Sequence, residues 1–176
     1  TKYFNPALSA DGQSLFVVEY PIGGGSQLVQ IDKKEGFVIK RIPAPPGGQI
    51  TEIAQIGDSL YALIITESGM GIYWTGISSD NGVWHNEIPD QHKYIQDLTV
   101  SDNSLCFTSD LDGLVNSYIY NPDLKLMRKL TNSRFGAKYP HIDNNSGRLY
   151  WADFGLKGYQ PVSAPLDSLD WRVADF

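Results

Sequence analysis

The chain has 176 residues, of which 41% are hydrophobic and 12% aromatic, so it is long enough to bury a core and is not intrinsically disordered. Its net charge of −6, without any basic run, argues against a nucleic-acid partner. No apolar run approaches the roughly 20 residues of a membrane helix, so we expect no direct membrane insertion by this segment.

The single cysteine, Cys106, lies between Leu105 and Phe107 in an apolar run. It cannot form an internal disulfide, and we expect it to be a small buried hydrophobe and not a nucleophile. The sequence starts at Thr1 and shows no signal peptide. We therefore expect a processed chain or a piece of a longer protein. The sequence predicts no cofactor.

Four leucines recur at nearly constant spacing, each after a short polar turn and before an aromatic or apolar residue: Leu15, Leu60, Leu105 and Leu149. The intervals between them are 45, 45 and 44 residues. Repeats of this length with matching local chemistry are typical of propeller blades.

Each repeat contains four predicted strands. The first repeat, residues 1–46, predicts strands at Tyr3–Leu8, Leu15–Val18, Gln27–Asp32 and Phe37–Ile42. The second, residues 47–91, predicts them at Ile50–Ile56, Leu60–Ile65, Gly71–Ile77 and Val83–Ile88. The third, residues 92–135, predicts them at Tyr94–Val100, from Leu105, at Asn116–Asn121 and at Leu126–Leu130. The fourth, residues 136–176, predicts them at Tyr139–Ile142, from Leu149, at Tyr159–Ser163 and at Leu169–Val173.

This pattern predicts an all-β fold, a β-propeller with four blade units of four antiparallel strands. The second strand of a blade is expected to be buried on both faces and therefore to read as a continuous apolar run, as Leu15–Val18 and Leu60–Ile65 do. The four repeat leucines are predicted to be core residues. A single helical turn is predicted at Pro165–Leu169.

An open arc of blades would expose two apolar end faces. Three solutions remain open from the residues alone: the four blades close into a ring, the full protein supplies more blades, or two chains pair as a dimer. The expected partners are accordingly another protein, or the remaining blades or domains of the same protein.

Several motifs resemble the WD40-like repeat of TolB-type propellers. They are Leu130-Thr131-Asn132 followed by Tyr139-Pro140, the run Ser109-Asp110-Leu111-Asp112-Gly113, and Ser9-Ala10-Asp11-Gly12 before Leu15. The second unit departs from the pattern with Gly57-Asp58, and the fourth with Ala152-Asp153-Phe154-Gly155. The resemblance implies an extracytoplasmic bacterial propeller, in the periplasm or cell envelope, usually of six blades.

The candidate binding residues stand eight positions before the repeat leucines, where the sequence has Ala7, Glu52, Asp97 and His141. If these positions are equivalent on the innermost strands, Glu52, Asp97 and His141 line a central channel and could hold a cation or a polar ligand. The alternative is an ordinary hydrated channel. No metal site is assigned, because His85, His92 and His141 lack metal-type spacing.

Other constellations are interpreted as structural. Gly23-Gly24-Gly25-Ser26 lacks the context of a hydrolase elbow or a phosphate loop and is expected to be a blade loop. Asp110 and Asp112 are expected to stabilise a turn and not to bind calcium.

The preferred function is a non-catalytic binding or scaffold module of a bacterial cell-envelope protein, which recognises a protein or a small polar ligand through its channel mouth and loops. One alternative is an accessory propeller of a prolyl-oligopeptidase-like hydrolase whose catalytic domain lies outside this chain. A further alternative is a carbohydrate-binding propeller that uses exposed tryptophans such as Trp84 and Trp171.

Overall fold

A computed structural model describes residues 2–78 and 82–175. In these residues the regular structure is β-strand, apart from one 3₁₀ turn, η1 (Leu166–Ser168), where the sequence predicts a single helical turn. The chain divides into two compact units, Thr1–His92 and Lys93–Phe176, and each is described by itself. No helix in the described ranges is long and apolar enough to span a bilayer.

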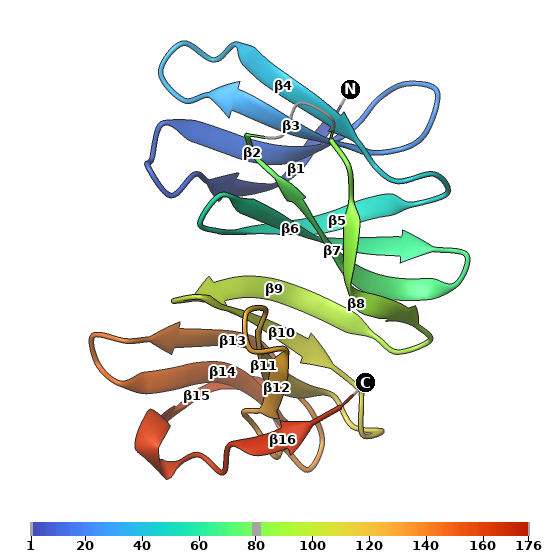
Figure 1. The fold of residues 1–176 in the computed structure, drawn as a ribbon. Coiled ribbons are helices and arrows are strands. Elements are labelled where there is room, and N and C mark those ends of the chain that lie inside the picture. Colours follow the sequence, from blue (N-terminus) through green and yellow to red (C-terminus); the bar gives the residue numbers. More distant parts are fainter. Residues whose placement is uncertain (1, 79–81, 176) are drawn as a thin grey trace. The chain divides into compact units, whose positions relative to one another are not determined.

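The first unit contains two antiparallel sheets of four strands each, and both follow chain order (Figure 1). The first sheet consists of β1 (Lys2–Leu8), β2 (Ser14–Tyr20), β3 (Gln27–Asp32) and β4 (Val38–Pro43). The second consists of β5 (Gln49–Ile56), β6 (Ser59–Thr66), β7 (Gly69–Gly76) and β8 (His85–Gln91). Both sheets are the four-stranded meanders that the repeat predicts.

The second unit also contains two sheets, drawn from yellow-green to red in Figure 1. The third sheet is formed by β9 (Ile95–Ser101), β10 (Ser104–Ser109), β11 (Asn116–Asn121), β12 (Leu126–Lys129) and, after β12, β16 (Arg172–Ala174). The fourth sheet is formed by β13 (Ala137–Asp143), β14 (Arg148–Gly155) and β15 (Gly158–Pro165). The all-β architecture of four sheets is confirmed.

The position of the last strand differs from the prediction. The sequence places Leu169–Val173 as the outer strand of the fourth sheet, but β16 pairs with β12 of the third sheet, with Arg172 opposite Lys129. The free edge of β15 explains the difference. Leu166 donates its backbone N–H to the carbonyl of Gly147, on the side of β14. Because the backbone groups of successive strand residues point to alternate sides, those of Tyr159, Pro161, Ser163 and Pro165 point toward the free edge. Two of these four residues are prolines and donate no hydrogen bond, which makes that edge a poor template for another strand.

The core of the first unit lies between its two sheets. Phe16, Val18 and Leu28 of the first sheet pack with Ile50 and Leu60 of the second in one buried cluster. Alternate residues of β6 point to opposite faces, yet five consecutive residues from Leu60 to Ile64 are buried, as predicted for a strand that is covered on both sides.

Two strand predictions fail at the ends of the repeat series. Leu60, Leu105 and Leu149 are buried, but Leu15 is only half-buried. β14 is likewise not an apolar strand covered on both faces, because Tyr150 and Phe154 are exposed. Phe16 and Leu149 pack against the other sheet of their own unit, so Leu15 and Tyr150, which are their neighbours along the strands, point away from that sheet.

Candidate functional site

The four innermost strands share an irregularity. Each of β1, β5, β9 and β13 has a β-bulge in its pairing with the next strand. Bulges re-aim side chains and are frequent near functional sites. Asn5, Asp97 and Tyr139 take left-handed backbone conformations at these bulges, with φ angles of 47°, 60° and 58°.

Strand register corrects the assumed equivalence of the three candidate residues. His141 lies opposite Tyr150, which follows a repeat leucine, and the residues at the same pairing position are Ala7, Ala54 and Thr99. The reason is turn length. Ile142 pairs with Leu149 and Leu8 with Leu15, whereas Gln55 pairs with Leu60 and Val100 with Leu105, so two of the turns are two residues longer.

Glu52 and Asp97 therefore occupy other positions. Glu52 is on β5, lies opposite Leu63 on β6 and is half-buried. The residues that occupy the same pairing position in the third and fourth repeats are Gln96 and Lys138. Asp97 sits inside the bulge of β9, also half-buried. Counting residues from the leucine thus aligned three positions that the sheets do not align.

Within the second unit, the structure does connect the strands of Asp97 and His141. The Oδ2 atom of Asp97 accepts a hydrogen bond from the backbone N–H of Tyr139 at 3.3 Å. The side chain of His141 is exposed two residues further along β13. Glu52 belongs to the first unit, and its convergence with the other two residues stays a prediction. Across residues 2–78 and 82–175, no three His, Cys, Asp or Glu side chains gather closely enough to hold a metal ion.

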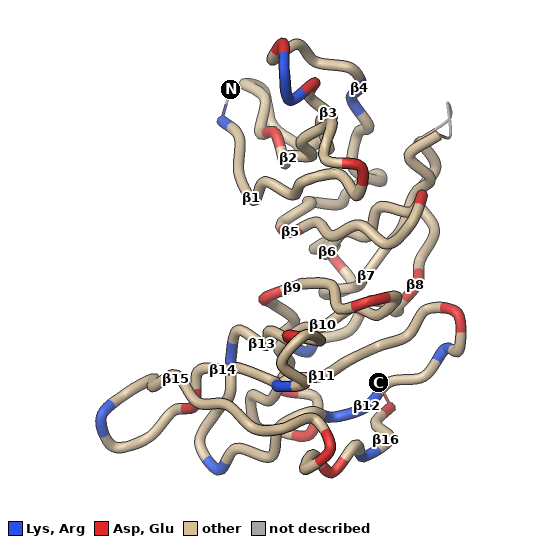
Figure 2. The backbone as a smooth tube through the Cα atoms, turned by 90° about the vertical axis from the view of Figure 1, so that its left-hand side faces the viewer, with Lys and Arg blue, Asp and Glu red and all other residues tan. Residues whose placement is uncertain are grey.

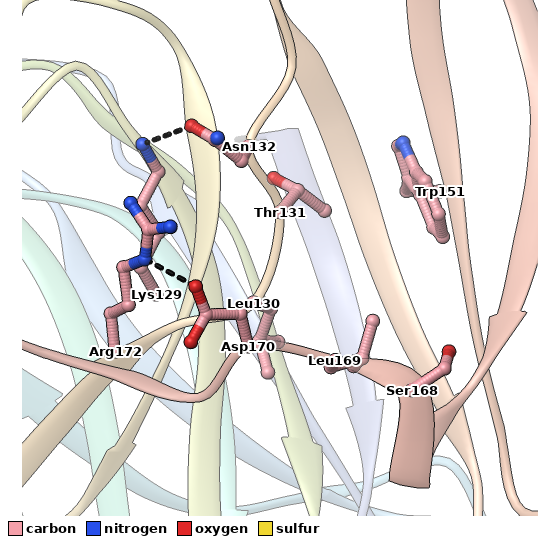
Figure 3. A pocket seen from close by; sticks show the side chains of 9 residues that line it. All are labelled: Lys129, Leu130, Thr131, Asn132, Trp151, Ser168, Leu169, Asp170 and Arg172. Carbon is pink, nitrogen blue, oxygen red and sulfur yellow. Dashed lines mark hydrogen bonds and ion pairs between the residues drawn. The ribbon is translucent and has the colours of Figure 1, made fainter.

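A pocket of about 180 Å³ lies in the second unit, next to the η1 turn (Figure 3). Trp151 forms one wall and Leu169 part of the floor, and charged groups lie opposite the indole. Lys129 donates to Asn132 at 3.4 Å and pairs with Asp112, while Arg172 pairs with Asp170. The pocket thus combines an aromatic wall with charges that are already paired, which suits a small polar ligand better than a single ion.

The Leu-Thr-Asn motif beside this pocket has a structural role. Leu130 donates its N–H to the carbonyl of Ser117 at 2.8 Å. The Thr131 hydroxyl accepts from the N–H of Ser117 at 2.9 Å and donates to Asn116 at 3.0 Å. These bonds fix the exit of β12 against β11. The motif therefore positions one wall of the pocket.

The residues interpreted as structural make contacts within the fold, although the carboxylates of Asp110 and Asp112 bond outside the turn that they were expected to stabilise. Burial raises the pKa of the Cys106 thiol to about 12, so this thiol is not an activated nucleophile. The Ser26 hydroxyl accepts the backbone N–H of Ile50 at 2.7 Å and so joins the two sheets of the first unit. Asp110 accepts the N–H of Tyr94 at 2.8 Å, and Asp112 accepts from Tyr118 at 3.2 Å.

Neither tryptophan named for sugar binding presents a fully exposed ring. Both are half-buried and pack beside core clusters. Trp84 donates its indole N–H to the carbonyl of Pro43 at 2.7 Å, and Trp171 donates to the carbonyl of Leu166 at 2.9 Å. Packing accounts for both side chains. Basic and acidic residues are interspersed along each unit, without a basic stripe (Figure 2).

Comparison with known proteins identifies the fold. No protein-family model matches the chain. No curated protein sequence matches it either. Solved structures do match. TolB from Acinetobacter baumannii is similar over 98% of this chain and 43% of its own, with a TM-score of 0.77 and 14% identity.

Two peptidases are also similar. A puromycin-hydrolyzing peptidase from Mycobacterium tuberculosis matches 99% of this chain and 28% of its own, with a TM-score of 0.74 and 14% identity. Dipeptidyl peptidase 4 from Porphyromonas gingivalis matches 93% and 29%, with a TM-score of 0.65 and 15% identity. The chain therefore has a TolB-like β-propeller fold, and it spans less than half the length of each of these proteins.

Proposed function

We propose that this chain is a non-catalytic binding or scaffold module that forms part of a larger β-propeller, usually of six blades in the family it resembles. The proposal rests on one observation, the exposure of Tyr150. The residue after the repeat leucine is Phe16 in the first sheet and Cys106 in the third. Each is only 1% exposed, because the next sheet of the same unit covers it. Tyr150 takes the same place in the fourth sheet and is 40% exposed.

The surroundings of Tyr150 have the character of a covered face. Leu149 and Trp151 point toward the third sheet, so Tyr150 and Phe154 point to the opposite side. Phe154 lies opposite Tyr159, and their ring centroids are 4.9 Å apart. We call Tyr150, Phe154 and Tyr159 the open face. A cluster of three exposed aromatic side chains on one sheet face favours packing against another sheet.

In this proposal a further blade of the same protein covers the open face. The bulged inner strands and the loops around the Trp151 pocket then remain free to recognise a protein or a small polar ligand. No catalytic residue is assigned within the chain. The resemblance to TolB-type propellers supports an extracytoplasmic location, which fractionation of cells expressing the tagged full-length protein would test.

One substitution, made both in the isolated chain and in the full-length protein, tests whether a further blade covers the open face. Tyr150→Asp should lower the melting temperature of the isolated chain by only a few degrees, because the side chain is partly in water there and aspartate merely has a lower strand propensity. The same change in the full-length protein should destabilise it strongly, because it would bury a carboxylate without a partner. Equal and small effects in both would refute a covering blade. Concentration-dependent association of the isolated chain that Tyr150→Asp abolishes would instead assign the face to a second copy.

The likeness to two peptidases favours one second candidate, an accessory propeller of a hydrolase. The catalytic domain would then lie outside this chain. The full-length protein decides between the two functions: cleavage of chromogenic peptide substrates, abolished by substituting a serine outside residues 1–176, would establish the hydrolase. Absence of any such domain from the gene product would leave the binding module.

A further inference from the structure

Arg128 differs from the other arginines whose side chains pack against the sheets. Arg41 pairs with Glu19 at 3.0 Å, Arg148 donates to Ser163 at 2.8 Å, and Arg172 pairs with Asp170. Arg128 is half-buried, and its Nε atom is buried without an acceptor among the described residues. A buried guanidinium N–H without an acceptor is costly, so a strong acceptor near this group would be favourable. The Nε atom itself is closed to solvent, so an external acceptor would meet the Nη atoms of the same guanidinium.

Arg128 lines a cavity of about 200 Å³ whose walls are mostly apolar. No carboxylate lies in that lining, which consists of Ser104, Ile119, Asn121, Leu124, Leu126, Arg128 and Trp171. The two other polar groups are already engaged. The Asn121 amide donates to Ser104 at 3.3 Å, and its oxygen accepts the N–H of Leu124 at 2.9 Å. Among the polar side chains that line this cavity, the Arg128 guanidinium is therefore the one with an N–H that lacks an acceptor.

The cavity is held by regular structure on two sides. Arg128 on β12 lies opposite Ile119 on β11 and opposite Val173 on β16, so the three share one face of the third sheet. Trp171 is fixed by its indole hydrogen bond to Leu166. Leu124, in the turn before β12, is 70% exposed and marks the open side. A ligand can thus approach past the Leu124 side chain toward the guanidinium of Arg128.

We propose that this cavity binds a carboxylate carried by an apolar group. The carboxylate would pair with the Arg128 guanidinium, and the apolar group would lie against Leu124, Leu126 and Trp171. Charge-assisted hydrogen bonds of this kind are about twice as strong as neutral ones, and the apolar walls exclude competing water. The same chemistry is presented by the C-terminal residue of a peptide and by a free hydrophobic acid. This site is separate from the open face and from the Trp151 pocket.

The test uses two probes that differ only in charge, N-acetyl-L-leucine and N-acetyl-L-leucinamide. The indole N–H signal of Trp171 is followed by NMR and assigned with Trp171→Phe. The acid should shift this signal in a saturable manner, and the amide should not. Equal binding of both probes, or no saturable shift with the acid, would overturn the proposal. A short peptide ending in leucine that binds more tightly than the free acid, and loses binding when amidated, would identify a peptide C-terminus as the source.

Two variants complete the test. Arg128→Gln should weaken binding of the acid about tenfold or more, the loss expected for a charged hydrogen bond. Arg134→Gln, which removes the same charge from an exposed side chain of the same unit, should leave binding unchanged. Without ligand, Arg128→Gln should not lower the melting temperature, because no other described group loses a hydrogen-bond partner when the Nε–H is removed. A large decrease would show that Arg128 serves the fold, and would contradict the proposal.

Discussion

The carboxylate of Asp97 accepts a hydrogen bond from the backbone N–H of Tyr139, and so links the bulges of two neighbouring innermost strands. The first unit has a counterpart, in which the Asn5 amide donates to the carbonyl of Thr51. In both units a side chain in a left-handed backbone conformation reaches the bulge of the next strand. The irregular inner strands are thus tied together, and the residues predicted to bind a ligand include one that stabilises the fold.

Removing this link should destabilise the second unit. Asp97→Ala should lower the free energy of unfolding by about 1–3 kcal/mol, because it removes a hydrogen bond and leaves alanine at a φ of 60°. Asp97→Asn should cost less, since the amide oxygen still accepts and asparagine tolerates this conformation. Urea unfolding measures both, with Asp123→Ala as a control at an exposed position. Equal effects of alanine and asparagine would contradict this role.

Ser26 should matter more than its glycine-rich loop suggests. Ser26→Ala leaves the buried N–H of Ile50 without its acceptor and should lower the free energy of unfolding by about 1–3 kcal/mol. Ser78→Ala, at an exposed serine of the same unit, should change it by less than about 0.5 kcal/mol. If both variants unfold at the same urea concentration as the parent chain, Ser26 does not join the sheets.

The repeat leucines should differ according to their burial. Leu60→Ala should cost about 2–5 kcal/mol, the range for a fully buried leucine. Leu15→Ala should cost about 1 kcal/mol, because part of that side chain is already in water. Thermal unfolding of the two variants in parallel measures the difference. A loss at Leu15 as large as at Leu60 would mean that the outer side of the first sheet is covered in solution.

The buried Glu19 should confer an acid-dependent stability. The Arg41 guanidinium that hydrogen-bonds it lowers the pKa of Glu19 from its ordinary value of 4.5. The charged form is therefore favoured by folding, so its contribution is present above pH 4.5 and is lost as pH falls through the lowered pKa. Glu19→Gln should lower the melting temperature at pH 7, and the gap should close in acid. A gap independent of pH would exclude the ion pair as its cause.

The fold was largely predictable because a 45-residue period in leucine and turn residues reflects the sheets directly. Leu60, Leu105 and Leu149 are all buried where the period places them. The last strand was not predictable from that period. Its partner depends on which N–H groups point outward at the edge of β15, and Pro161 and Pro165 remove two of them.

The candidate site was less predictable, because the side-chain period of a strand is two while turn length varies between repeats. Two extra residues in the turns before Leu15 and Leu149 displace His141 from the pairing position of Glu52, and the bulge of β9 takes Asp97 out of the pairing altogether. The Arg128 cavity was missed for another reason. Its lining joins the β11–β12 hairpin to Trp171, more than 40 residues further along the chain, and the predicted strand that contains Trp171 was assigned to the wrong sheet.

Hydroxyl-radical footprinting of Tyr150 tests the central claim most directly, that this chain is part of a larger propeller. Side chains react in proportion to their exposure, and Tyr150 is 40% exposed in the chain described here. Oxidation of Tyr150 should fall severalfold in the full-length protein relative to the isolated chain, while oxidation of the exposed Phe37 stays the same. Equal oxidation of Tyr150 in the two proteins would contradict the claim.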